Sequence, residues 1–253
     1  MERRSNSHKG ENGKIGVIGG SYDYSGAPAL SGRAALRTGA DLVRVLTSEY
    51  VKDVVAGYSE NLIVDGYDSK YFGESSVEMA ERLEDWTDVL VIGPGLSCAR
   101  QGLLQNLIEN AEKPLVIDAD AIQVVPRSDI SNAVITPHEN EAKHLRRKYG
   151  TIEEFIEMKD DIVVLLKGST DKIYSSEGIE TVSTGHPGMT VGGTGDVLTG
   201  IVAGLIAQGM SKKEAAVRAA EVNGLAGEKA AEKYGNGLVA TDLLDRIPEV
   251  LMR

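Results

Sequence analysis

The most informative stretch of this chain reads His186-Pro187-Gly188-Met189-Thr190-Val191-Gly192-Gly193-Thr194-Gly195-Asp196-Val197-Leu198-Thr199-Gly200. Three glycines within four residues precede Asp196, and an apolar helix is predicted from Val197 onward. Glycines let consecutive backbone N–H groups converge on one point, and a helix start adds the positive end of its dipole. The stretch therefore predicts an anion site suited to a transferring phosphoryl group, with Asp196 as proton acceptor for an attacking hydroxyl. It also fits a tight turn in which Asp196 only caps the helix.

The order of strands and helices around this stretch indicates an α/β fold. Short apolar runs without alternation are typical of strands buried on both faces, and they occur at residues 15–18, 42–46, 88–92, 115–117, 133–135 and 162–166. Helices are predicted at residues 29–38, 75–84, 102–111, 139–149, 152–158, 196–208, 212–233 and 241–250. Alternation of this kind predicts a mostly parallel sheet covered by helices, with a hairpin at residues 172–183.

The composition limits the classes of partner. Lys and Arg total 27 against 38 Asp and Glu, which gives a formal net charge of -11. Such a surface repels polyanions, so we expect no nucleic-acid partner and no membrane partner. The single Cys98 excludes an internal disulfide and fits a reducing cytoplasm, and no apolar run approaches the roughly 20 residues of a membrane span. The 253 residues suit a single domain, 1–253, whose first residues (about seven) are expected to be flexible.

Glycines or ionisable residues follow nearly every predicted strand, at the positions where parallel sheets bind ligands. These strand ends are Gly19-Gly20-Ser21, Gly93-Pro94-Gly95, Asp118-Ala119-Asp120, Thr136-Pro137-His138 and Lys167-Gly168-Ser169-Thr170-Asp171. Asp118 and Asp120 are expected to share one side of an extended strand end, although Asp120 also fits a helix cap. Together, these ends predict a small-molecule site.

The glycine–Asp segment resembles the ribokinase-like superfamily, and further motifs resemble one family within it. These motifs are His8-Lys9-Gly10, Gly19-Gly20-Ser21, Gly26-Ala27-Pro28, Gly93-Pro94-Gly95-Leu96, Asp118-Ala119-Asp120-Ala121, Thr136-Pro137-His138, Lys167-Gly168 and Thr241-Asp242-Leu243-Leu244. The set is similar to the ADP-dependent NAD(P)H-hydrate dehydratases over nearly the whole chain. The resemblance implies a ribokinase-like three-layer fold, with a mostly parallel central sheet and helices on both faces.

The resemblance also implies repair of a damaged nicotinamide cofactor. NADH or NADPH that has gained water, written NADHX or NADPHX, would be phosphorylated on the new hydroxyl by ADP, or alternatively by ATP. Phosphate is a far better leaving group than hydroxide, so its departure would restore the dihydronicotinamide and leave AMP and phosphate as products of ADP. Mg²⁺ is the implied cofactor.

Roles implied by the resemblance fall on residues of these motifs. The backbone N–H groups of Gly193, Thr194 and Gly195 would bind the transferring phosphoryl group, and Asp196 would accept the hydroxyl proton. The residues expected to contact substrate are Ala27, Gly95, His138 and Asp196. Those expected to contact nucleotide are Lys167, Gly168, Ser169, Thr170, Asp171 and Gly195. A helix N-terminus stabilises a carboxylate, so Asp196 is expected to be a weak base. Lys167 would reach a phosphate, unless it is merely a solvated lysine at a strand end.

Glu141 is expected to support Mg²⁺ through water, or else only to complement its own helix dipole. The family tends to form homo-oligomers, so a dimer or tetramer is expected. The apolar residues 197–206 fit either a core helix or an interface. Two other functions stay open: a kinase of the same fold acting on a thiamin-precursor alcohol or a pyridoxal-like substrate, and a catalytically silent nucleotide-sensing module.

Overall fold

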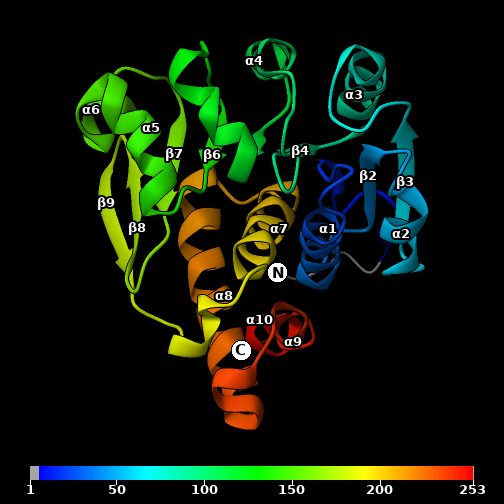
Figure 1. Ribbon diagram of the computed structural model, residues 1–253. Coiled ribbons are helices and arrows are strands. Elements are labelled where there is room, and N and C mark those ends of the chain that lie inside the picture. The colour runs from blue at the N-terminus through cyan, green and yellow to red at the C-terminus, as the bar shows by residue number, and fades with distance from the viewer. Residues whose placement is uncertain (1–5, 253) are drawn as a thin grey trace.

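The computed structural model describes residues 6–252, and a mixed sheet forms its centre (Figure 1). Its strands are β1 Lys14–Ile18, β2 Leu42–Ser48, β3 Leu62–Tyr67, β4 Val89–Ile92, β5 Leu115–Ile117, β6 Ala133–Ile135, β7 Ile162–Leu166, β8 Asp171–Ser175 and β9 Gly178–Val182. Their order across the sheet is β3-β2-β1-β4-β5-β6-β7-β8-β9. The pairs from β3 to β7 are parallel, whereas β7–β8 and β8–β9 are antiparallel. The predicted parallel sheet and the hairpin after it are confirmed.

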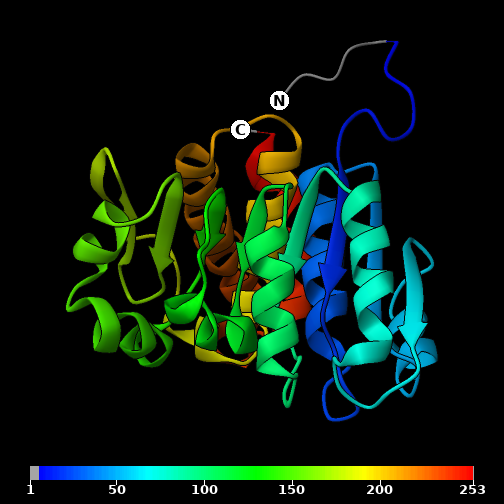
Figure 2. The same ribbon diagram turned by 90° about the horizontal axis from the view of Figure 1, so that it is seen from above.

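Helices cover both faces of this sheet and make a three-layer molecule (Figures 1 and 2). They are α1 Gly26–Thr38, α2 Lys52–Gly57, α3 Glu74–Trp86, α4 Gln101–Asn110, α5 Glu139–Tyr149, α6 Ile152–Glu157, α7 Thr194–Ala207, α8 Lys212–Tyr234, α9 Ala240–Leu244 and α10 Ile247–Leu251. One apolar core joins the sheet to α1, α7 and α8, and a second joins its other face to α3, α4, α5 and α6.

Successive strand residues enter opposite cores because side chains alternate across a strand. Val89 and Val91 of β4 face the core of α7, while Leu90 and Ile92 face the opposite core. Both sets are almost fully buried. Strands covered on both sides have no polar face, which explains why their sequence pattern was an unbroken apolar run.

Several local features differ from the sequence expectations. β3 and α2 were not predicted, since the edge strand Leu62–Tyr67 contains Asp65 and Gly66 and reads as a loop. The closing helix expected at 241–250 is divided into α9 and α10, and Pro248 lies in the first turn of α10. Asp118 and Asp120 do not share a strand face, because Ala119 has φ 50° and starts a 3₁₀ turn.

The expectation of flexible first residues falls mostly on residues 1–5, which lie outside the described part of the chain. Among the helices at residues 6–252, none has both the length and the apolar character needed to cross a membrane.

Candidate active site

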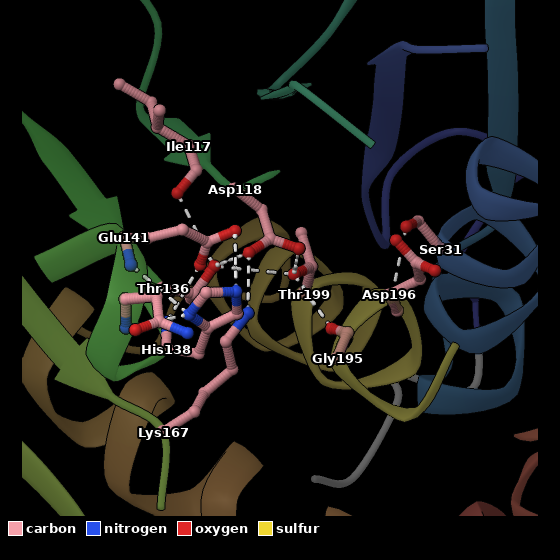
Figure 3. A network of polar contacts seen from close by, with 11 residues as sticks. Ser31, Ile117, Asp118, Thr136, His138, Glu141, Lys167, Gly195, Asp196 and Thr199 are labelled. Carbon is pink, nitrogen blue, oxygen red and sulfur yellow. Dashed lines mark hydrogen bonds and ion pairs between the residues drawn. The ribbon is translucent and has the colours of Figure 1, made fainter. Parts of the chain in front are cut away.

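The candidate site lies where the carboxyl ends of β5, β6 and β7 meet the start of α7 (Figure 3). β5 leads into Asp118, β6 into Thr136 and β7 into Lys167. Parallel pairing brings these ends to one edge of the sheet. Beyond the strands, the Lys167 N–H donates to the Pro137 carbonyl at 2.8 Å and keeps the segments after β6 and β7 together. The sheet thus gathers side chains that lie far apart in the sequence.

Asp118 is the centre of a buried polar network (Figure 3). Its Oδ1 accepts hydrogen bonds from Lys167 Nζ and from Thr136 Oγ1, both at 2.8 Å. Its Oδ2 accepts one from Thr199 Oγ1 of α7 at 2.9 Å. A buried carboxylate is costly unless it is paired and hydrogen-bonded, and here all three partners come from different elements. The network therefore fixes β5, the segments after β6 and β7, and α7 relative to one another.

The Lys167 ammonium lies at the start of α7 rather than in solvent. Its side chain is 19% exposed and is ion-paired with Asp118, so the alternative of a solvated strand-end lysine is wrong. Burial alone would lower the pKa of Lys167, but Asp118, Glu141 and Asp196 outweigh it and raise that pKa above its ordinary value. A Cβ atom placed on Gly195 would lie 3.3 Å from Lys167 Nζ. A fixed positive charge and a helix N-terminus together make an anion site.

Asp196 lies in the first turn of α7 and does not cap it. The N-cap is Gly193, whose φ of 98° favours glycine, and the helix has no side-chain cap. Burial raises the pKa of Asp196 to about 7, and the Asp118 charge acts in the same direction while Lys167 opposes both. The expectation that the helix dipole makes Asp196 a weak base is therefore wrong, because burial outweighs the dipole. A carboxylate with this pKa can accept a proton near neutral pH.

A cavity of about 550 Å³ opens beside this start of α7. Its walls are the segment after β7, the loop between β9 and α7, and one turn of α8. The lining residues are Lys167, Gly168, Ser169, Asp171, Thr184, Gly185, His186, Pro187, Met189, Thr190, Thr194, Gly195, Leu198, Asn223 and Gly224. Most of the residues expected to contact a nucleotide therefore line one cavity, next to Asp196.

Two residues of the nucleotide segment have local bonds as well. Asp171 Oδ1 accepts a hydrogen bond from the Gly168 N–H at 2.9 Å and holds the turn after β7, and burial raises the pKa of this carboxyl. Thr170 is absent from the cavity lining, and its hydroxyl lies 3.3 Å from the Ser183 hydroxyl. Within the segment 167–171, Thr170 is therefore the residue that does not line the cavity.

His138 and Glu141 form a reciprocal cap at the start of α5. His138 Nδ1 accepts from the N–H groups of Asn140 and Glu141, at 3.0 and 3.2 Å, and Glu141 Oε2 accepts from the His138 N–H at 2.8 Å. Because Nδ1 is an acceptor here, Nε2 is the nitrogen that carries the imidazole proton. His138 Nε2 lies 3.5 Å from Glu141 Oε1, and the His138 side chain is half-exposed, so a ligand can still reach its ring.

The other two residues expected to contact substrate lie together on the α1 side of Asp196. A Cβ atom on Gly95 would be 3.3 Å from Ala27 Cβ and 3.1 Å from Tyr24 Cβ, and Gly95 has φ 71°. Ser31 Oγ lies 3.3 Å from the Ala27 carbonyl and donates to the Asp196 carbonyl at 3.0 Å (Figure 3). Ser31 thus links the start of α1, where Ala27 and Gly95 meet, to the first turn of α7.

Asp118, Thr199 and Asn223 are among the residues of the site and its cavity to which the sequence assigned no role. Asp118 stood out only as a carboxylate at a strand end. Thr199 belongs to no motif and lies in a predicted apolar helix. Asn223 lies among alanines and glycines of α8, so the sequence around it does not mark it as functional. Their positions depend on which elements pack together, which a linear pattern does not contain.

The chain is similar to known proteins both in sequence and in fold. The sequence pattern of the NAD(P)H-hydrate dehydratase family matches residues 15–249. The ADP-dependent (S)-NAD(P)H-hydrate dehydratase of Haloterrigena turkmenica is 43% identical over 242 residues, covering 95% of this chain and 93% of the relative. A ribokinase-like superfamily protein of Enterococcus faecalis superposes with a TM-score of 0.85 and 26% identity, covering 100% of this chain and 91% of that one.

The Bacillus subtilis ADP/ATP-dependent NAD(P)H-hydrate dehydratase, co-crystallised with ATP/Mg²⁺, superposes with a TM-score of 0.82 at 26% identity. The match covers 100% of this chain and 93% of the Bacillus chain. The fold is therefore ribokinase-like, as the sequence predicted. By its sequence over nearly its whole length, this chain belongs to the NAD(P)H-hydrate dehydratase family.

Proposed function

We propose that this chain dehydrates the (S)-hydrates of NADH and NADPH, using ADP as the phosphoryl donor. This is the activity for which the Haloterrigena turkmenica relative is named. The observation that carries the proposal is the position of Asp196. It is a carboxylate with a pKa of about 7 at a glycine-rich helix start, adjacent to Thr194 and Gly195 of the cavity wall.

The reaction would proceed in two steps, phosphoryl transfer and then elimination of phosphate. The hydroxyl oxygen of the hydrate forms a bond to the terminal phosphorus of ADP, the bond from that phosphorus to the AMP oxygen breaks, and Asp196 takes the hydroxyl proton. The carbon–oxygen bond then breaks, phosphate leaves, and loss of a ring proton restores the double bond of the dihydronicotinamide. In the first step the protein mainly positions the groups and stabilises charge, which is the usual contribution to phosphoryl transfer.

Residues of this chain would divide that work. The N–H groups of Gly193, Thr194 and Gly195 and the Lys167 ammonium would bind the phosphoryl oxygens. Ala27 and Gly95, near the start of α1, and His138, which lies beside Lys167, would contact the hydrate. The network around Asp118 would hold the Lys167 ammonium in a fixed position relative to α7. No free energy would then be needed to order this side chain during the reaction.

Mg²⁺ fits this site through phosphate and water oxygens. Within residues 6–252, no group of three or more His, Cys, Asp or Glu side chains is placed to hold a metal ion. Glu141 nevertheless acts electrostatically on both Lys167 and Asp196. Mg²⁺ prefers carboxylate and phosphate oxygens and keeps several waters, so Glu141 would hold it through water. The bound ion would neutralise negative charge on the phosphates.

The test is incubation of the pure protein with NADH hydrate, ADP and Mg²⁺. The proposal requires that the dihydronicotinamide absorbance reappears, that AMP and phosphate form, and that neither occurs without nucleotide or with a chelator. A stable phosphorylated alcohol without restored absorbance would instead support the kinase of the same fold. Tight nucleotide binding without either reaction would support the nucleotide-sensing module. Replacing ADP by ATP, and NADH hydrate by NADPH hydrate, measures the two preferences.

A homo-oligomer and a cytoplasmic location are part of the same proposal. The apolar surface of α7 does not support an oligomer, since residues 197–206 are all buried within the chain. An interface would have to use another surface, and exposed apolar side chains at Tyr22, Tyr24, Tyr50 and Tyr58 are available for one. Light scattering at micromolar concentration should give the mass of a dimer or tetramer, and a monomeric mass would contradict this expectation.

A further inference from the structure

Asn223 is a buried polar side chain on α8 without a hydrogen-bond partner for its oxygen. Within the described residues, Asn223 Oδ1 accepts no hydrogen bond, and the side chain is only 8% exposed. Its helix neighbours on the buried side are apolar, namely Ala219, Ala220, Val222 and Ala226. A carboxamide buried in such surroundings is unfavourable unless a partner arrives from elsewhere.

Asn223 lies in the wall of the cavity beside Asp196. Lys167 and Gly195 form the part of the wall that would hold phosphates, so the rest of a nucleotide would extend along the other walls. Those walls include Asn223 together with the apolar side chains of Met189 and Leu198. Ligand pockets are mostly apolar with a few well-placed polar groups, and a purine base has apolar faces and a polar edge that suit such a wall.

The polar groups near Asn223 already have partners. Thr184 Oγ1 lies 3.4 Å from carbonyl oxygens of α8, the Gly185 N–H donates to Glu228 at 2.9 Å, and His186 Nδ1 accepts from the Gly188 N–H at 3.1 Å. Among the buried side-chain atoms that line this cavity within the described residues, Asn223 Oδ1 is thus the one without a hydrogen-bond partner. The exocyclic amino group is the hydrogen-bond donor on the edge of adenine, and Asn side chains pair with that edge in other settings.

We infer that Asn223 recognises the base of the nucleotide, by accepting a hydrogen bond from the 6-amino group of adenine. This inference rests on the proposed function, because it assumes that the cavity holds ADP. Asn223 would not touch the reacting atoms. It would determine which nucleotide enters the cavity, whereas Lys167, Gly195 and Asp196 would act on the phosphates of any nucleotide that binds.

The experiment compares ADP with purine riboside diphosphate, which lacks only the 6-amino group. In the wild type, the missing amino group should lower kcat/KM about tenfold, mainly through KM, because Oδ1 stays unpaired. In Asn223→Leu, which matches Asn closely in size, kcat/KM with ADP should fall about tenfold and equal that with the analogue. Asn223→Ala should give the same loss of discrimination, and it replaces the Leu variant if that chain fails to fold. The matched control is Asn106→Leu on α4, an exposed Asn outside this cavity, which should keep the wild-type preference.

Calorimetric binding of the same two nucleotides separates this inference from the proposed reaction. If the wild type binds ADP more tightly than the analogue and Asn223→Leu does not, the inference holds even when no dehydration is detected. An equal fall in affinity for both nucleotides, or an unchanged preference, would overturn it and leave Asn223 a structural residue. 2′-DeoxyADP is titrated as a third nucleotide, and a variant that changes only the preference between ADP and 2′-deoxyADP would also overturn the inference, since the carboxamide would then recognise the ribose.

Discussion

At the scale of single residues, Asp196 combines a catalytic advantage with a cost in stability. Its folded-state pKa is about 7, against an ordinary value of 3.8. Between these two pH values the unfolded chain has lost a proton that the folded chain keeps. Stability therefore falls as pH rises from about 4 to 7, and is lowest above pH 7. Burial of Asp196 makes it a better base and makes the folded protein less stable.

We predict that Asp196→Asn loses activity and gains stability. Turnover should fall by on the order of 10²-fold or more, since no other group takes the hydroxyl proton. The free energy of unfolding at pH 8 should rise by about 2 kcal/mol, because the buried charge is gone. At pH 4 the gain should vanish, since Asp196 is then protonated in the folded wild type. Activity assays and urea unfolding at both pH values measure these effects, and near-normal turnover would leave Asp196 without a catalytic role.

In the wild type, the same pKa predicts a pH profile. The value of kcat/KM should increase as pH rises towards about 7 and then level off, since the base must be ionised to accept a proton. The profile is measured with NADH hydrate and ADP at fixed ionic strength. A profile without an inflection between pH 5 and pH 8, roughly, would argue against Asp196 as the base.

The ion pair of Asp118 and Lys167 gives a third prediction. Asp118→Asn keeps a side chain that can bond Thr136 and Thr199 but removes the charge opposite the buried Lys167 ammonium. It should lower the free energy of unfolding by about 3 kcal/mol. Adding Lys167→Met should recover part of this loss, because the unpaired charge is then absent. Urea unfolding of both single variants and the double variant tests this, and purely additive losses would show that the pair is not coupled.

How much the sequence reveals differs from residue to residue. Gly193, Gly195 and Asp196 are adjacent in the chain, so their pattern alone predicts an anion site. The Asp118 network joins residues from four segments and becomes visible only when those segments pack together. The raised pKa of Asp196 could not be predicted either, because burial depends on α1 and the sheet, whereas the helix dipole is apparent from the sequence.

At the scale of elements, close contact between α1 and α7 sets the position of Asp196. A Cβ atom on Gly200 would lie 2.1 Å from the Ser31 carbonyl oxygen and 2.8 Å from Ala34 Cβ. Two helix backbones can approach this closely only where a side chain is missing. Since Ser31 Oγ also donates to the Asp196 carbonyl, the same contact holds the first turn of α7 in place.

We therefore predict that Gly200→Ala destabilises the protein and impairs catalysis together. The added methyl group should force the two helices apart at a cost of about 3 kcal/mol, and activity should fall because Asp196 moves with α7. Gly102→Ala on α4 is the matched control, since a Cβ there meets nothing within 4 Å. The control should be neutral or stabilised by up to about 1 kcal/mol. Thermal unfolding and turnover of both variants test the prediction, which equal stability of the two variants would contradict.

Among the elements, those buried on both sides were the most predictable from sequence. β1, β4, β5, β6 and β7 read as apolar runs because both faces are covered. The edge strand β3 was missed because Ile63 is exposed and Asp65 pairs with Arg44 on the sheet surface. An edge strand has one free side and tolerates polar residues, so its pattern resembles that of a loop.

At the scale of the whole molecule, one sheet connects the end that carries the cavity with the end that carries Trp86. The cavity lies beside β7, whereas the single Trp86 ends α3 and its ring lies 5.4 Å from the Arg44 guanidinium of β2. Five strand spacings separate β2 from β7, or about 24 Å. Both apolar cores nevertheless extend without a break from β2 to β8. Within residues 6–252, neither core is interrupted between β2 and β8. A single domain over 1–253 stays a prediction.

We predict that both ends unfold in one transition. Far-UV circular dichroism, which reports on all elements, and Trp86 fluorescence, which reports on the β2 end, should give the same midpoint in urea. ADP at about 100 times its Kd should raise the free energy of unfolding by about 2.7 kcal/mol for both probes, although it would bind at the β7 end. If ADP shifted the circular dichroism transition and left the Trp86 transition unchanged, the sheet would comprise two independent units. ADP that binds near β7 can stabilise the region around Trp86 only if the two regions unfold together. The two apolar cores, which are continuous across the intervening strands, are what would make the unfolding cooperative.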